Sequence, residues 1–269
     1  MVPDRAGRAA LSVTGNCPRI LSIAGSDSGG GAGIQADIKT ITMLGGHAMT
    51  AITAITAQNT MGVQSVHRVP TEMILAQIES VVSDIGVDAV KVGMIGSAEA
   101  AGEVADYLTK LGIAIVFDPV MVATSGSELA DSDTIAAFGK LMDVASVVTP
   151  NLPELAALGG RDAILSHGCH LVVKGGHGKG SVVVDELYAP GGLIRRIEGK
   201  KLDTSETHGT GCTFASALTL GLGSGLDLIA AFEQAISFTR IAILEAPGLG
   251  AGNGPLGHQF VTNFQDDSR

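Results

Sequence analysis

The segment Arg19-Ile20-Leu21-Ser22-Ile23-Ala24-Gly25 decides the fold class of this chain, because it is a short apolar run that ends at a glycine. A glycine-rich loop, residues 26–33, follows it directly. Apolar residues then recur at helical spacing, which predicts a helix over about 32–44. Strand, loop and helix in this order form a βα unit, the repeating unit of parallel sheets.

The same alternation continues along the rest of the chain. The predicted strands are apolar throughout, as in a sheet that helices cover on both faces, and they span 48–57, 88–94, 113–117 and 146–149. One predicted helix begins at Thr71, and four others span 98–111, 133–142, 211–222 and 227–245. Three closely spaced short strands, 171–174, 181–184 and 193–197, indicate an antiparallel edge. We therefore predict an α/β fold with a central, mostly parallel β-sheet.

The predicted domain organisation is one domain over residues 19–269. Nothing in the sequence has the length or composition of a linker between two domains. Residues 1–18 show no clear period, and we expect them to form a mobile N-terminal extension.

Charge and composition exclude several classes of partner. A formal net charge of −10 opposes binding to nucleic acid or to an anionic membrane. No apolar run reaches the roughly 18 residues of a membrane span. Cys17, Cys169 and Cys212 form no CxxC pair, so neither a disulfide framework nor a zinc site is predicted, and we expect a cytoplasmic protein. The histidines have no metal-ligand spacing, and we expect His208 to be at most a positioning residue.

The glycine-rich loop does not match the common nucleotide-binding patterns. A dinucleotide-binding site needs an acidic residue at the end of the second strand, and 48–57 contains none. No glycine is followed by the Lys-Ser or Lys-Thr of a P-loop. Two interpretations remain: a loop that closes over a small ligand, with Asp37 on the following helix, or a tight turn that needs glycine for its backbone angles.

Polar residues follow several of the strands, where ligands bind in open α/β sheets. Asp118 ends one strand and Asn151 follows the next, with Glu154 three residues later. Oxygen ligands of this kind suit Mg²⁺, but Asn-Leu-Pro-Glu is equally a helix-capping pattern, and both interpretations are compatible. Lys174 ends another apolar strand, either to contact a phosphate or simply as a solvated side chain before a turn.

The stretch Thr207-His208-Gly209-Thr210-Gly211-Cys212-Thr213 opens a long apolar helix. Its amides and the helix dipole would converge on one point, which favours an anion. Cys212 lies at this point, and a cysteine at a helix N-terminus tends to have a lowered pKa. The alternative is a glycine turn with a small buried cysteine as core filler. The combination with the strand-end residues favours the anion site.

Together these motifs resemble the ribokinase-like superfamily and, within it, the hydroxymethylpyrimidine/phosphomethylpyrimidine kinases of thiamin biosynthesis. The similarity spans about residues 19–247. The segments that carry it are 23–37, 57–60, 91–94, 118–121, 149–154, 174–177 and 207–213.

The resemblance implies a reaction and a set of roles. The γ-phosphoryl group of ATP, with Mg²⁺, would pass to 4-amino-5-hydroxymethyl-2-methylpyrimidine and then to its monophosphate. The residues implied to hold the pyrimidine are Gly25, Asp37, Gln58, Met94 and Val120. Those implied to serve the nucleotide are Lys174, Asn151 and Thr210, and those implied to serve Mg²⁺ are Asp118 and Glu154. The amides of Gly209, Thr210, Gly211 and Cys212 would form the anion hole, with Cys212 in the position of the superfamily's catalytic aspartate.

The chain departs from the family between Glu154 and Lys174, where there is room for only a short helix. We expect that face of the sheet to be covered less completely. Two other functions remain open: a pyridoxal kinase of the same superfamily, whose substrate also carries a hydroxymethyl group, and a non-catalytic small-molecule binding module. The resemblance also implies a homodimer.

Overall fold

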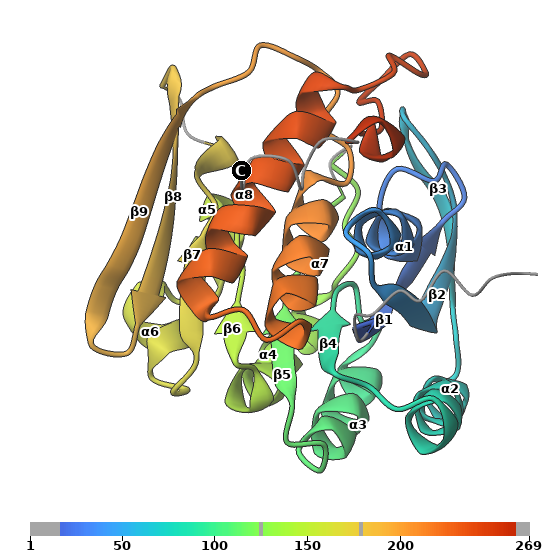
Figure 1. Ribbon diagram of the computed structural model, residues 1–269. Helices are drawn as coiled ribbons and strands as arrows, with labels where there is room; N and C mark the ends of the chain where they lie inside the picture. The colour runs from blue at the N-terminus through green and yellow to red at the C-terminus, as the bar shows by residue number, and fades with distance from the viewer. Residues whose placement is uncertain (1–16, 124–125, 178–179, 262–269) are drawn as a thin grey trace, which may run out of the picture.

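The computed structural model describes residues 17–123, 126–177 and 180–261, and these form one α/β unit built around a single sheet. Residues 1–16, most of the predicted N-terminal extension, lie outside the described part of the chain. The sheet order is β3-β2-β1-β4-β5-β6-β7-β8-β9 (Figure 1). Helices cover both faces, as the continuous apolar strands predict.

The parallel centre of the sheet consists of six strands. They are β1 (Arg19–Asp27), β2 (His47–Asn59), β4 (Ala89–Val92), β5 (Ala114–Phe117), β6 (Val147–Val148) and β7 (His170–Val173). The antiparallel edges are β3 (Gly62–Arg68) on one side and β8 (Val182–Ala189) with β9 (Gly192–Lys200) on the other. The mostly parallel sheet with an antiparallel edge is therefore confirmed, and the second antiparallel edge, β3, is additional.

The helices form two layers (Figure 1). One layer contains α2 (Thr71–Asp84), α3 (Ala98–Leu108) and α4 (Ser132–Val144), which pack on the larger hydrophobic cluster. The other contains α1 (Gly33–Met43), α7 (Thr210–Gly223) and α8 (Leu228–Leu244). Short 3₁₀ turns lie at Gly175–His177 and His258–Phe260. Among the described residues, no helix is long and apolar enough to cross a membrane.

The segment between β6 and β7 differs in detail from the prediction. It contains two short helices, α5 (Leu152–Ala157) and α6 (Arg161–Leu165), instead of one. Gly159 and Gly160, with φ of +85° and +89°, separate them in a left-handed turn. Short helices do occupy this stretch, as its length predicts.

Strand alternation selects which side chains face the layer of α1 and α7. In β4, Val90 and Val92 pack into the cluster on the α2–α4 side, so Lys91 points to the opposite face. In β1, Leu21 and Ile23 likewise face α2–α4, and Ser22 faces α1. The polar residues of these strands thus meet under α1 and α7.

The core beneath α7 and α8 gives a direct test of this packing. Phe232 is fully buried and makes an edge-to-face contact with Phe214 at 6.2 Å between ring centroids. We expect Phe232→Ala to lower the free energy of unfolding by about 3–5 kcal/mol in urea denaturation, because it leaves a cavity. Phe260, which is 52 % exposed, is the control. Phe260→Ala should change stability by less than about 0.5 kcal/mol, and equal effects would contradict the assignment.

Candidate active site

The N-terminus of α7 forms one wall of the candidate site. Gly209 caps the helix in a left-handed conformation with φ of +86°, and an added Cβ would overlap the carbonyl oxygen of Gly31. The amide of Thr210 donates to the Thr207 carbonyl at 3.2 Å, so it is used inside the turn. Within the described residues, the amides of Gly211 and Cys212 have no such partner. These two amides are the groups available to an anion.

A buried cation lies beside these amides. Lys174 Nζ is 2.6 Å from Asp118 Oδ1, and Thr149 donates to the same oxygen at 3.1 Å. A Cβ on Gly211 would lie 3.2 Å from Lys174 Nζ, so the helix N-terminus and the ammonium group face one point. Burial opposes the charge on Lys174, but Asp118 and Glu154 outweigh it and raise the pKa of the lysine. The group is therefore cationic at neutral pH.

Asn151 and Glu154 form a capping box at the start of α5. Asn151 Oδ1 accepts from the Glu154 amide at 2.9 Å, and Glu154 Oε2 accepts from the Asn151 amide at 2.8 Å. The capping interpretation is thus confirmed, and the side-chain oxygen of Asn151 is occupied by it. Burial raises the pKa of Glu154 to about 7, with Asp118 adding to the shift and Lys174 opposing it.

Asp118 and Glu154 are the carboxylates that fit a divalent cation. The described residues contain no cluster of three or more histidine, cysteine or acidic side chains suited to a metal. Two carboxylates beside a phosphate site match the way Mg²⁺ is held, because phosphate oxygens and water complete its coordination. The donor set fits Mg²⁺ carried by a nucleotide better than a metal bound by protein alone.

The prediction of a lowered pKa for Cys212 is wrong. Burial raises the pKa of the thiol to about 11; Lys91 opposes this shift, and Asp37 and Asp118 add to it. The amide of Gly33 donates to the sulfur, but this bond does not offset the loss of water. The sequence shows the helix N-terminus and does not show how closely the glycine-rich loop covers it.

Asp37 lies beneath the site and is fully buried, with no exposed surface for a ligand in this conformation. Its oxygens accept from Ser22, Ser216 and Lys91, the last at 3.0 and 3.1 Å. The structure therefore places it below the predicted ligand-contact surface. Ser216 is one helical turn after Cys212, which puts the Asp37–Lys91 pair under the thiol.

Lys91 is the site residue that sequence reasoning missed. It is fully buried, and although burial opposes its charge, Asp37 and Cys212 raise its pKa above the ordinary value. A lysine in the middle of an otherwise apolar, four-residue buried strand was the available signal.

Four other predicted site residues lie near the ends of β1, β2, β4 and β5. A Cβ on Gly25 would lie 2.9 Å from Met94 Sδ, so the thioether covers the end of β1. Val120 lies next to Asp118, because its amide donates to the Asp118 carbonyl at 2.8 Å. Gln58, at the end of β2, is 9 % exposed. The structure thus brings Gly25, Gln58 and Met94 to the strand ends, as predicted, and places Val120 beside Asp118.

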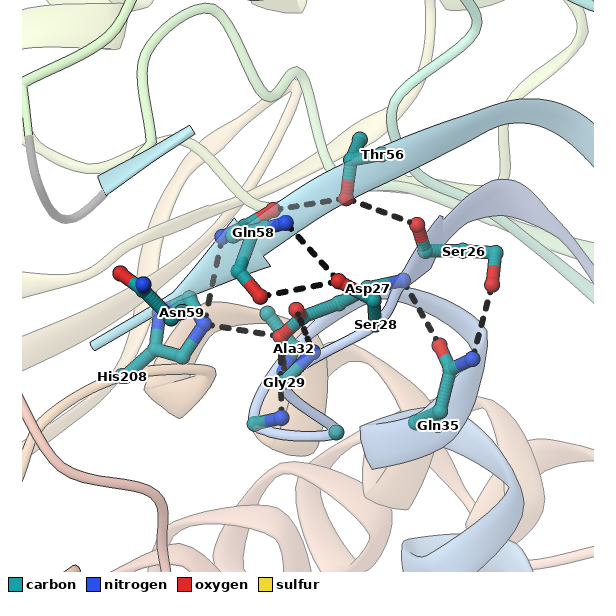
Figure 2. Close-up of polar contacts among 12 residues, drawn as sticks. Ser26, Asp27, Ser28, Gly29, Ala32, Gln35, Thr56, Gln58, Asn59 and His208 are labelled. Carbon is teal, nitrogen blue, oxygen red and sulfur yellow. Dashed lines mark hydrogen bonds and ion pairs between the residues drawn. The ribbon is translucent and has the colours of Figure 1, made fainter. Parts of the chain in front are cut away.

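His208 joins the two ends of the site (Figure 2). Its Nε2 lies 2.9 Å from Asp27 Oδ2 and 3.3 Å from the amide nitrogen of Gln58. Asp27 also accepts from the amides of Gly29, Gly31 and Ala32 at 2.8–2.9 Å, which fixes the glycine-rich loop. An added Cβ at Gly31 would overlap the His208 ring, so glycine makes this contact possible.

The comparisons with known proteins agree with this architecture. The phosphomethylpyrimidine kinase family matches residues 27–257. The hydroxymethylpyrimidine/phosphomethylpyrimidine kinase of Rhizobium meliloti is 46 % identical over 88 % of this chain and 96 % of its own length. The enzyme of the same description from Bacillus subtilis is 40 % identical over 93 % of this chain and 98 % of its own.

Solved structures show the same fold. An ADP complex of Bacillus subtilis pyridoxal kinase has a TM-score of 0.83 and 34 % identity, covering 91 % of this chain and 98 % of that one. Phosphomethylpyrimidine kinase from Clostridium difficile has a TM-score of 0.72 and 37 % identity, covering 84 % and 99 %. The protein is therefore of the ribokinase-like class. Within that class, the chain belongs to the phosphomethylpyrimidine kinase family.

The buried pair under the thiol predicts a strong coupling. We expect Lys91→Met to lower the free energy of unfolding by about 3–5 kcal/mol, because it leaves Asp37 buried without a cation. Adding Asp37→Asn should restore at least about half of the loss in urea denaturation. Additive single effects would contradict direct pairing. Arg68→Met, which removes a pair with Asp131 that is half exposed on both sides, is the control and should cost less than about 1 kcal/mol.

The raised pKa of Cys212 predicts slow alkylation. Iodoacetamide reacts with thiolate, which is a minor species of this thiol far below pH 11. At pH 8 we expect the Cys212 peptide to be labelled about a hundredfold more slowly than an unstructured cysteine, as followed by mass spectrometry. The rate should still rise at pH 10. Exposed Cys17 in the same sample is the internal control, and equal rates would contradict the burial effect.

Proposed function

We propose that this protein catalyses the ATP-dependent phosphorylation of 4-amino-5-hydroxymethyl-2-methylpyrimidine and then of its monophosphate, in thiamin biosynthesis. The observation that carries the proposal is the position of Cys212. It belongs to the α7 N-terminus that faces Lys174, the phosphate end, and its sulfur accepts from the amide of Gly33, which lies against the Gly25 carbonyl at the ring end, where Met94 and Gln58 also lie. This chain covers nearly the whole length of these relatives, and their names support the same reaction.

At the phosphate end, the chain supplies positioning and positive charge. The amides of Gly211 and Cys212 receive the transferring phosphoryl group, and Lys174 balances the charge of the phosphates. Asp118 and Glu154 hold Mg²⁺, which neutralises phosphate charge when bound. The hydroxymethyl oxygen forms the new bond to the γ-phosphorus as the bond to ADP breaks, and its proton leaves to solvent or a phosphate oxygen.

The structure favours an orienting role for Cys212. A thiol whose pKa is near 11 is a poor proton acceptor at neutral pH, but it packs against and directs the alcohol. Phosphoryl transfer needs little base catalysis when the alcohol is aligned with the leaving group. Lys91 and Asp37 act from below by holding α1 and α7 in place around this thiol.

A second candidate activity is the phosphorylation of pyridoxal. It is favoured by the similarity to pyridoxal kinases, including the Staphylococcus aureus enzyme in complex with AMP-PCP and pyridoxal, at 31 % identity and a TM-score of 0.81. Both substrates carry a hydroxymethyl group on a nitrogen-containing ring. Steady-state kinetics with the two alcohols would rank them by kcat/KM.

The remaining parts of the proposal follow from the family and the composition. We infer a cytoplasmic homodimer whose kinase domain spans residues 19–269, with residues 1–18 as an extension. The dimer is what the resemblance to the family implies. Free cysteines at Cys17, Cys169 and Cys212 support a reducing compartment. Analytical ultracentrifugation measures the oligomeric state directly.

The reaction is tested by ATP consumption with the pyrimidine as acceptor. We expect turnover with Mg²⁺ and a loss of at least about a hundredfold when EDTA removes it, because the phosphates then lack their cation. Product analysis by mass spectrometry should show the monophosphate first and the diphosphate later. Turnover of pyridoxal alone would favour the second candidate, and no turnover of either alcohol would contradict both.

The role of Cys212 is tested by Cys212→Ala. We expect kcat to fall by about 10- to 100-fold with little change in ATP affinity, because the alcohol loses its orientation and the phosphate contacts remain. Lys174→Met should instead raise the KM for ATP. A Cys212→Ala variant that retains the full rate would remove the thiol from the mechanism.

A further inference from the structure

His208 links the two ends of the site, the ring end through its side chain and the phosphate end through its backbone. Nε2 lies near Asp27 and Gln58, while the backbone of His208 directly precedes the Gly209 cap of α7. The side chain is 6 % exposed. Its amide donates to the Gly254 carbonyl at 3.1 Å, and Gly31 lies against its ring. The imidazole therefore has a fixed position from which to act.

The hydrogen bonds around His208 show which of its partners must accept a hydrogen and which must donate one. Burial opposes ionisation of Asp27, but the hydrogen bond from His208 and the loop amides outweigh it and lower the pKa of the carboxyl. A contact of 2.9 Å to this carboxylate requires a hydrogen on Nε2. The end of the Gln58 amide that faces the same Nε2–H must then be its oxygen, since two N–H groups would repel.

The contacts of Thr56, at the other end of the Gln58 amide, support the same orientation of that amide (Figure 2). Its hydroxyl has one hydrogen and donates it to the Ser26 carbonyl oxygen, which lies 2.9 Å from Thr56 Oγ1. The Gln58 amide lies 3.1 Å from the same Thr56 oxygen. With the hydroxyl hydrogen used by Ser26, this oxygen needs a donor from Gln58. Turning the terminal amide by 180° places –NH₂ at Thr56 and oxygen at His208, which satisfies both ends.

We propose that His208 is a positioning residue that sets the direction of the Gln58 amide and thereby the direction in which the aminopyrimidine ring binds. This inference rests on the proposed function. After the contacts to His208 and Thr56, the amide keeps one lone pair on oxygen and one hydrogen on nitrogen. This acceptor and donor, side by side, complement an amino group next to a ring nitrogen.

The direction matters because the substrate is not symmetric about that edge. Its amino group neighbours the carbon that carries the hydroxymethyl group, and the ring nitrogen lies on the other side. An amino group held at the His208 end of the amide directs the hydroxymethyl group toward the His208–Cys212 loop. The opposite amide direction would turn it toward Thr56 and away from the phosphate end.

The test compares two alcohols, the aminopyrimidine and an analogue with hydrogen in place of the amino group. In the wild type we expect kcat/KM to favour the aminopyrimidine by about 5- to 150-fold, because the analogue leaves the buried amide oxygen of Gln58 without its partner. His208→Leu removes the Nε2 donor at similar size, and the preference should fall below about threefold. His208→Gln, whose amide supplies a donor at a similar reach, should restore most of the preference.

Two further variants keep the test decisive. His258→Leu removes another buried histidine beside α7, where it contacts Thr213 at 2.7 Å, and should leave the preference unchanged. Thr56→Val removes the partner of the Gln58 –NH₂ group without touching His208. It should weaken the preference several-fold, so the inference remains testable if His208→Leu fails to fold.

The outcomes separate this inference from the proposed function. A wild type that phosphorylates neither alcohol overturns the proposed function and, with it, the inference. An active wild type without a preference overturns the inference alone. So does a His208→Leu variant that loses kcat equally for both alcohols and keeps the wild-type preference, because His208 would then only support the loop.

Discussion

The buried ion pair between Lys91 and Asp37 is the interaction on which the rest of the site depends. It joins β4 to α1, and the hydroxyls of Ser22 and Ser216 extend it to β1 and α7. A carboxylate without exposed surface is tolerable only when its oxygens are satisfied, and here four hydrogen bonds do so. Because Asp37 and its three partners come from four elements, the pair fixes the N-terminus of α7 over the strand ends.

The glycines of two loops bring the remaining residues of the site together. The glycine-rich loop after β1 and the turn before α7 touch at Gly31 and Gly209, where any side chain would overlap backbone or ring atoms. This approach lets the Gly33 amide reach Cys212 and lets His208 reach Asp27. It also shields the thiol partly from water, and this loss of solvation raises the pKa of Cys212. One close contact between two loops therefore explains both the shape of the site and its electrostatics.

The sequence predicted the parallel sheet, both helix layers and the strand-end residues, because continuous apolar strands that alternate with amphipathic helices are compatible with few other folds. It did not predict β3, of which only Gly62 is buried, because an exposed edge strand lacks the apolar signal. It placed Asp37 on the ligand surface and overlooked Lys91. Both differences have one cause: periodicity shows which face of an element a residue occupies but not how deeply that residue is buried.

The raised pKa of the Cys212 thiol fits the chemistry of phosphoryl transfer. The transition state is loose and develops charge mainly on the phosphoryl oxygens, so the alcohol oxygen needs alignment more than deprotonation. In the proposed mechanism, the α7 amides and the Lys174 ammonium group would stabilise that charge without titrating near neutral pH, and a protonated thiol would add no negative charge beside it. A thiolate at the same place would repel the incoming phosphate. The raised pKa of Cys212 is therefore compatible with catalysis by position, since the site keeps its net charge favourable to the nucleotide.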